Sequence, residues 1–255
     1  MAAALSELGR HVRVHDPDRF YAALFAPAER REALFALLAF NHEIARVRDA
    51  VSEPQLGEMR LHWWQSALDG VAAGAAPEHP IAQALAAARG AQAFPLEPLC
   101  ALIEARAFDL YDVPMADMAA LEAYARATGG GLHRLLAEVL GADEPGLAAA
   151  EHAGTAWALT GILRALPIHA ARGQSYIPQG EGGVPAAVQL AHTHYRQART
   201  TAAGAALPAI LAAALVPSYL RRAARNAHDP LHRQMELGKP ERLARILFAA
   251  LRNRI

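Results

Sequence analysis

The chain has 255 residues, of which 53% are apolar, 6% aromatic and 20% charged, and its formal net charge at pH 7 is zero. This composition is too rich in core-forming residues for a disordered chain, and the neutral balance gives no general argument for nucleic-acid binding. The single cysteine, Cys100, excludes an internal disulfide and gives no basis for a cysteine-based zinc site. Alanine is abundant, and it favours helices because its side chain loses no rotamer entropy there.

Helical periodicity dominates the first half of the chain. Asp16 and Pro17 are a typical helix cap and first-turn proline, so they predict a helix start. The helices expected in this half cover about 17–25, 28–51, 53–68, 80–92, 96–111, 117–128 and 130–140. The glycines at 129–131 lack the preceding strand and the Lys-Ser/Thr of a phosphate loop, so they predict a helix break or a close approach of two backbones.

The second half begins with a long helix, expected from Pro145 to about Leu166 and ended by Pro167. Residues 167–185 are rich in glycine and proline and predict a loop. Helices are expected again at about 186–206, 208–216, 218–227 and 239–252.

Neither a membrane span nor a secretory signal is expected. Residues 202–220 come closest to a transmembrane segment, but Pro208 and Pro217 interrupt them, so two short core helices are expected there. The first twenty residues contain no long apolar stretch. Because no strand, repeat or linker pattern occurs, the sequence predicts an all-α protein with one domain over residues 1–255.

Several segments, taken in order, resemble the squalene/phytoene synthase family. The similarity covers most of the chain and is carried by residues 20–49, 59–68, 79–85, 102–112, 121–136 and 158–178. It implies an isoprenoid-synthase-type helical bundle around a central cavity.

Enzymes of this family carry two aspartate-rich motifs on facing helices. A diphosphate leaving group is strongly negative, and Mg²⁺ ions must bridge it to the protein while charge develops. Carboxylates one turn apart on a helix supply the oxygen ligands. The resemblance therefore identifies two places where this chemistry must appear if the chain catalyses prenyl transfer.

Most of those carboxylates are missing from this chain. In the first motif the two leading positions are Ala45 and Arg46, and only Asp49 remains; in the second, aligned through 162–164, the positions are Ala165 and His169. One of five expected carboxylates is therefore kept. Arg46 and His169 are expected to face the metal region, and a guanidinium there disfavours a divalent cation. No catalytic residue, metal or cofactor is expected.

Two interpretations of the basic residues remain open. Arg46, Arg164 and Arg172, with Asp49 and Tyr176, are candidate ligands for an anionic headgroup bound without metal. The alternative, which we favour, is that the arginines form ion pairs inside the bundle with Asp49, Glu43, Glu104 or Asp109.

The pattern of loss is similar to one non-catalytic branch of the family. Residues 41–64 and 162–178 are similar to a mitochondrial complex I assembly factor with a squalene/phytoene synthase domain, and to its bacterial relatives. This resemblance implies a pseudoenzyme that promotes assembly of the NADH:ubiquinone oxidoreductase, with respiratory-chain subunits as partners, or a scaffold that holds an isoprenoid in its cavity. The alternative is an Mg²⁺-dependent prenyltransferase with diverged motifs, acting on farnesyl or geranylgeranyl diphosphate.

Two further patterns lie outside the motif regions. His228 and His232 have helical metal-ligand spacing, but Pro230 lies between them and no third ligand is evident, so no metal site is expected. From Arg221 onward there are nine Lys/Arg against three Asp/Glu, which suggests either peripheral attachment to an anionic membrane or a solvated bundle face. The expected location is the bacterial cytoplasm, with the inner membrane as a peripheral binding surface.

Overall fold

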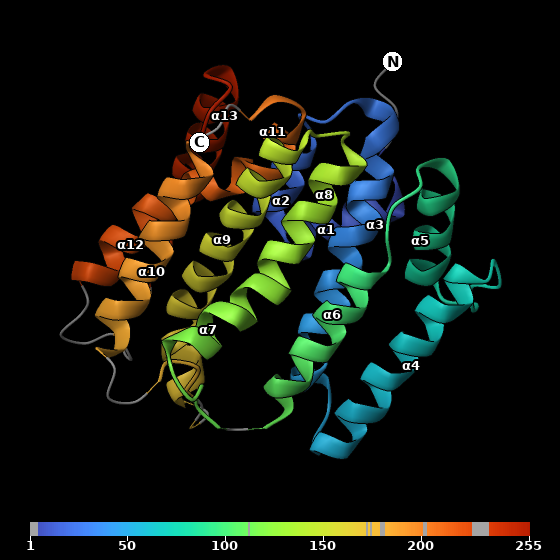
Figure 1. Ribbon diagram of the computed structural model, residues 1–255, viewed down its shortest axis with the longest axis horizontal. Coiled ribbons are helices and arrows are strands. Elements are labelled where there is room, and N and C mark those ends of the chain that lie inside the picture. The colour runs from blue at the N-terminus through green and yellow to red at the C-terminus, as the bar shows by residue number, and fades with distance from the viewer. Residues whose placement is uncertain are drawn as a thin grey trace.

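The computed structural model describes residues 5–111, 113–171, 173, 175–178, 182–200, 203–225 and 235–255. Within these residues every regular element is helical, which confirms the expected all-α class (Figure 1). The α-helices are α1 (Glu7–His15), α2 (Pro17–Ala23), α3 (Ala28–Ala45), α4 (Pro54–Ala72), α5 (Pro80–Ala91), α6 (Glu97–Arg106), α7 (Met118–Ala125), α8 (Gly131–Val139), α9 (Glu144–Ala171), α10 (Gly183–Ala198), α11 (Leu207–Ile210), α12 (Val216–Arg225) and α13 (Lys239–Leu251). Short 3-10 turns are η1 (Arg48–Ala50), η2 (Ala107–Leu110), η4 (Gly204–Ala206) and η5 (Leu211–Leu215), and η3 (Arg126–Gly130) is a π-helical turn.

Local capping explains how the first helices start. The Asp16 side chain accepts a hydrogen bond from the Arg19 amide at 3.4 Å, and Pro17 occupies the first turn of α2, as predicted. An additional helix, α1, precedes it and was not expected. Its cap is Ser6, whose hydroxyl accepts from the Gly9 amide at 2.9 Å. The two helices are therefore joined directly through Asp16.

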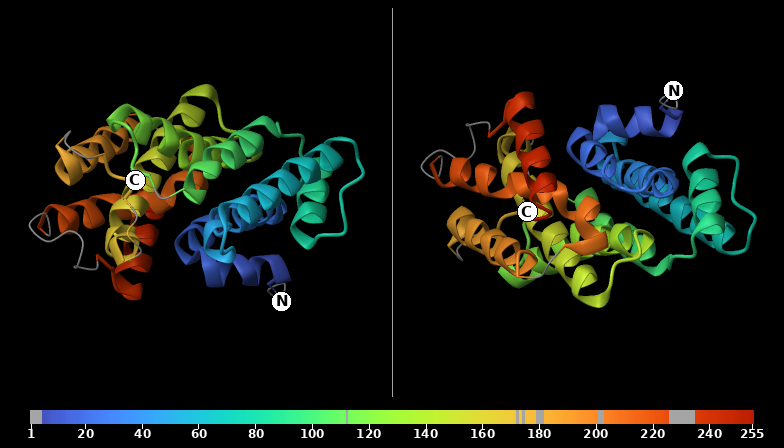
Figure 2. Two further views of the ribbon diagram at one scale, coloured as in Figure 1. Left: turned by 90° about the horizontal axis from the view of Figure 1, so that it is seen from below. Right: turned by 90° about the horizontal axis from the view of Figure 1, so that it is seen from above.

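Helix α9 is the central element of the bundle. It packs against α8, α10 and the π-helical turn η3, and it runs between them through the middle of the molecule (Figure 1). Seen along the bundle, α4 and α5 form one end and α10 and α12 the other (Figure 2). A side chain on α9 can therefore reach the interior from a helix that is itself fixed on several sides.

The predicted end of this helix at Pro167 is wrong. Helix α9 continues to Ala171 with Pro167 inside it. A proline removes one backbone hydrogen bond, but its fixed φ lies in the helical range, so the helix can continue for another turn beyond it. The residues that were expected to open a loop, including His169, therefore lie on the last turn of α9.

Segment Gly204–Arg225 is long and apolar enough to cross a membrane by length and composition, but 67% of its most apolar window is buried inside the bundle. It consists of η4, α11, η5 and α12 rather than one regular α-helix. Leu211, Leu215 and Leu220 are fully buried within it. This burial is typical of a core segment.

Two glycines allow α9 to approach the π-helical turn closely. A Cβ atom added to Gly154 would lie within 3.0 Å of the Gly129 carbonyl oxygen and of the His133 Cβ atom, and one added to Gly129 would clash with the Gly154 carbonyl. The expectation of a close backbone approach at residues 129–131 is therefore confirmed. The alternative expectation, a helix break, is wrong, because the chain passes from α7 through η3 into α8 without leaving a helical path.

This contact predicts different effects for two glycines of the same helix. Gly154→Ala should lower the free energy of unfolding by about 3 kcal/mol, because a backbone carbonyl opposite the new methyl group cannot rotate away as a side chain can. Gly161→Ala is the matched control: nothing lies within 4 Å of its added Cβ, so it should raise stability by about 0.5–1 kcal/mol. Urea denaturation of both variants measures the difference. Equal stability of the two variants would contradict the close approach.

Candidate functional site

A cavity of about 460 Å³ lies between the helices at the centre of the bundle. Helices α3, α6, α7 and α9 supply most of its wall, together with the turns η1, η2 and η3. The lining residues are Arg19, Asn41, Ala45, Arg48, Asp49, Arg106, Asp109, Tyr124, Thr128, Gly129, Trp157, Ala158, Gly161, Ile162, Ala165, Ile168, His169 and Tyr176. Asp49, Gly161 and Ile168 are solvent-exposed, so the cavity opens to the surface on their side.

The structure brings the two degenerate motifs to this one cavity. Ala45 and Asp49 reach it from the end of α3 and from η1, and Ala165 and His169 reach it from the last turns of α9. Tyr176 also lines it, and its ring centroid lies 4.8 Å from that of His169. Two segments more than a hundred residues apart therefore face each other where the sequence alignment placed them.

The expected position of Arg46 needs correction. Arg46 follows the last residue of α3, is solvent-exposed, and approaches Glu43 at 3.6 Å rather than lining the cavity. Arg48 lines it instead. Helix α3 ends at Ala45 and the 3-10 turn η1 begins at Arg48, so the direction of successive side chains no longer follows a regular α-helix.

The other predicted basic ligands are also outside the cavity lining or outside the described residues. Arg164 pairs with Glu236 at 3.0 Å and stacks on the Tyr219 ring, with 4.2 Å from its guanidinium carbon to the ring centroid. Arg172, like His228 and His232, lies outside the described residues. The favoured expectation, ion pairing inside the bundle, holds only in part: Arg46 pairs with Glu43, as expected, but from an exposed position, and Arg164 pairs with the exposed Glu236, which was not an expected partner.

The best-connected acid in the cavity is Asp109. It is 7% exposed and accepts hydrogen bonds from Arg106 at 2.9 Å, from the Tyr124 hydroxyl at 2.6 Å and from the Tyr176 hydroxyl at 2.9 Å. Arg106 also donates to the Tyr124 oxygen at 2.7 Å. This network joins α6 and η2 to α7 and to the segment that follows α9.

The electrostatics of the network keep the two tyrosines and Arg106 each in one protonation state. Burial, together with the neighbouring Asp109 carboxylate, raises the pKa of Tyr124 well above its ordinary value, and the same two causes raise the pKa of Tyr176. Burial by itself would lower the pKa of Arg106, but Tyr124 and Asp109 outweigh it and raise the pKa. Both phenols therefore remain donors and Arg106 remains charged at neutral pH.

Sequence reasoning considered Asp109 only as one of several partners for distant arginines, and it missed Arg106 and Tyr124. Arg106 and Asp109 are three residues apart within the segment 102–112, a spacing that places two side chains on one helical face. That spacing could have indicated a local ion pair. Nothing local in the sequence indicates that two tyrosines complete it.

The donor set of the cavity does not fit a magnesium cluster. Among the described lining residues there are two carboxylates, Asp49 and Asp109, against the guanidinium groups of Arg19, Arg48 and Arg106. Asp109 already accepts three side-chain hydrogen bonds, and Arg19 is paired with Asp16 at 2.5 Å. Mg²⁺ requires an octahedron of oxygen ligands, and nearby guanidinium groups repel it.

The lining suits a molecule with one charged end and one apolar end. Arg48, Asp49 and Arg106 supply charged groups, whereas Trp157 and Ile162 supply apolar surface within the same cavity. Most small-molecule sites combine apolar walls with a few polar groups that fix orientation, and this volume lies within their usual range. The geometry therefore suits a small amphiphile with an anionic end.

Comparison with known proteins agrees with the resemblance. The model of the family described as "Squalene/phytoene synthase" matches residues 12–182, which is more than half of the chain. The chain belongs to the squalene/phytoene synthase family. Among solved structures, a dehydrosqualene synthase in complex with ligand superimposes with a TM-score of 0.77 at 14% identity, covering 96% of this chain and 94% of that one. At this identity the likeness shows the fold.

Curated relatives in the family are more similar in sequence. The NADH dehydrogenase (ubiquinone) complex I assembly factor 6 of Mus musculus is 31% identical over 250 residues, which cover 88% of this chain and 75% of that protein. The protein of the same name from Bos taurus is 34% identical over 168 residues, covering 66% of this chain and 50% of its own length. The second alignment thus spans only half of the relative that it matches.

The Asp109 network predicts a large cost for removing its acceptor. Asp109→Ala should lower the free energy of unfolding by about 3–5 kcal/mol, because Arg106 is then left as a buried charge without its counter-ion. Tyr176→Phe removes one hydrogen bond and should cost about 1 kcal/mol. Chemical denaturation followed by circular dichroism measures both values.

Glu236→Ala provides a control for the loss of a carboxylate. Its side chain is 61% exposed in the pair with Arg164, so removing it should change stability by less than about 1 kcal/mol. A loss in Asp109→Ala no larger than in Glu236→Ala would contradict the structural importance of the network.

Proposed function

We propose that this protein promotes assembly of the respiratory NADH:ubiquinone oxidoreductase as a family member that does not transfer prenyl groups. The observation that carries the proposal is its similarity, over most of the chain, to proteins named complex I assembly factor 6. The proposed partners are subunits or assembly intermediates of that complex.

The cavity supports the non-catalytic part of this proposal. Ionisation of a prenyl diphosphate requires cations that neutralise the departing diphosphate, and carboxylates must hold those cations. Ala45 and Ala165 offer methyl groups at two of the motif positions, and the nearby guanidinium of Arg48 adds positive charge. No cofactor is therefore needed for the proposed role.

A second candidate role, binding of an isoprenoid without turnover, is favoured by the cavity itself. A protein that only served as a surface for other subunits could fill its centre with side chains, as most cores do. Here a cavity of about 460 Å³ remains, with apolar and charged groups in its wall. An isoprenoid or quinone-like molecule with a polar head has the matching chemistry.

The proposed location is the cytoplasmic face of the bacterial inner membrane, with α13 as the peripheral contact. Leu247, Phe248 and Leu251 on this helix are 51%, 59% and 77% exposed. Arg252 lies beside them, with its guanidinium carbon 5.1 Å from the Phe248 ring centroid. Exposed apolar side chains next to cations are typical of helices that lie at an anionic lipid surface.

Deletion of the gene tests the assembly role directly. Membranes of the deletion strain should lose most NADH:ubiquinone oxidoreductase activity and accumulate partly assembled complex, because the proposed factor acts before the complex is complete. A plasmid copy should restore both. Asp49→Asn should restore them as well as the original chain, since no metal chemistry is required of Asp49. Unchanged NADH:ubiquinone oxidoreductase activity in the deletion strain would contradict the proposal.

A turnover assay tests the enzymatic alternative. Purified protein with farnesyl or geranylgeranyl diphosphate and Mg²⁺ should release no diphosphate above the background of a denatured sample, because the cavity lacks the carboxylates to hold the cations. Diphosphate release that Asp49→Asn abolishes and Glu53→Gln leaves intact would establish a prenyltransferase instead. Glu53 is an exposed acid outside the cavity lining and serves as the matched control.

Liposome sedimentation tests the membrane contact. The protein should sediment with vesicles containing anionic phospholipid and remain in solution with purely zwitterionic vesicles, and added salt should release part of it. Replacing Phe248 and Leu251 with serine should reduce the bound fraction several-fold, because two exposed apolar anchors are lost. The same change at Val14, which is 71% exposed on α1, should have no effect. Absence of binding to anionic vesicles at low salt would remove α13 as the contact.

A further inference from the structure

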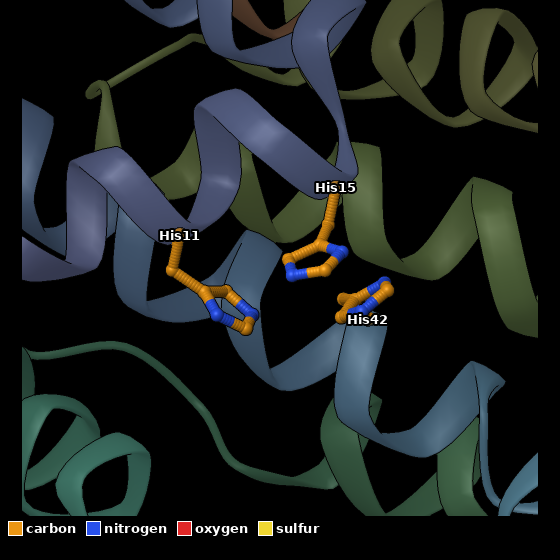
Figure 3. A group of neighbouring side chains, drawn as sticks. All are labelled: His11, His15 and His42. Carbon is orange, nitrogen blue, oxygen red and sulfur yellow. The ribbon is translucent and has the colours of Figure 1, made fainter.

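Three histidines from two helices meet outside the cavity. His11 and His15 are one turn apart on α1, and His42 lies on α3, which packs against α1. Figure 3 shows the three imidazole rings directed toward one common space between the helices. Ring centroids are 4.6 Å apart for His11 and His15, 4.3 Å for His15 and His42, and 5.4 Å for His11 and His42.

Their ring nitrogens satisfy the first requirement of a metal site. One nitrogen from each ring can be chosen so that all three lie within 4.8 Å of one another. Ligands around a tetrahedral zinc ion at 2.0–2.1 Å lie about 3.3 Å apart, so ring rotations that move each nitrogen by about 1 Å would complete the geometry. Both helices can remain in place during such a movement.

Two of the three rings have a buried nitrogen that makes no hydrogen bond to the described part of the chain. Among the described residues, the Nε2 atoms of His11 and His42 are buried and have no hydrogen-bond partner. Burying a polar nitrogen without a hydrogen-bond partner costs free energy. Two such nitrogens in neighbouring rings therefore indicate a place where a ligand could bind. Burial, together with the neighbouring His15, also lowers the pKa of His42 to about 4 and lowers the pKa of His11.

We propose that His11, His15 and His42 bind one divalent transition-metal cation of the zinc class. Three imidazole ligands suit Zn²⁺, Co²⁺, Ni²⁺ or Cu²⁺, whereas Mg²⁺ and Ca²⁺ prefer oxygen. His15 is solvent-exposed, so water has access to the fourth position. Glu43 and Arg46 lie near the cluster with opposite charges. Glu43 acts to raise the pKa of His11 and His42, and Arg46 acts to lower it.

The site differs in position and chemistry from the central cavity. None of its three histidines lines that cavity, although Asn41 and Ala45 of the same helix do. A bound cation would join the end of α1 to the last turns of α3 and thereby restrain the helix that carries Asn41 and Ala45. Its role is therefore to stabilise one wall of the cavity, and the proposal does not depend on the assembly function.

Calorimetric titration tests the site in untagged full-length protein treated with a chelator and then freed of it. Zn²⁺ should bind with one saturable equivalent and raise the melting temperature, because the folded state binds the cation and the unfolded state holds no preformed site. Excess Mg²⁺ should neither compete nor stabilise. Co²⁺ in place of zinc should give the visible absorption of a nitrogen-ligated ion.

Two histidine variants separate the cluster from adventitious binding. His15→Gln alters an exposed side chain, so the protein should remain folded by circular dichroism while its Zn²⁺ affinity falls at least about tenfold. His62→Gln, an exposed histidine on α4, should leave the affinity unchanged. His42→Gln should abolish the Co²⁺ spectrum. Absence of a saturable equivalent, or equal affinity in His15→Gln and His62→Gln, would overturn the proposal.

Discussion

The hydrogen bonds accepted by the Asp109 carboxylate are the interaction on which the shape of the cavity depends. Its three donors come from α6, from α7 and from the segment after α9, so one buried anion ties together three walls of a hollow bundle. A cavity normally weakens a protein because the lining atoms lose packing partners. Charge-assisted hydrogen bonds at its edge, in a region of low dielectric, offset part of that loss. The wall can therefore stay open without a ligand holding it.

This arrangement also explains why the fold tolerates the loss of its aspartate motifs. In a metal-dependent member, carboxylates on facing helices repel one another until cations neutralise them. Replacing two of them by Ala45 and Ala165 removes that repulsion from the end of α3 and from α9, and the Arg106–Asp109 pair keeps its own charge balance. Among the described lining residues, three arginines face two carboxylates, so the balance of charge in the wall is positive.

Helical periodicity predicted the all-α class, and the resemblance to the family implied the helical bundle and its two facing motif regions. It placed Ala45, Asp49, Ala165, His169 and Tyr176 at one site, and all five line the cavity. The prediction failed at the end of α3, where Arg48 rather than Arg46 reaches inward. It also failed at Pro167, where the backbone stays helical through the proline. It also missed contacts made only in the folded chain. His11 and His15 have a recognisable spacing, but nothing near them indicates that His42 completes the group.

Different faces of α3 contribute to the central cavity and to the histidine cluster. One face carries Asn41 and Ala45 to the cavity, and the other carries His42 to α1. Residues one position apart on a helix point about 100° apart, so neighbouring residues can serve a binding cavity and a cation site without sharing atoms. A cation held by imidazole nitrogens on the outer face would fix α3 while leaving the charge inside the cavity unchanged. The proposed cation site thus lies outside the cavity, on the same helix that contributes Asn41 and Ala45 to the cavity wall.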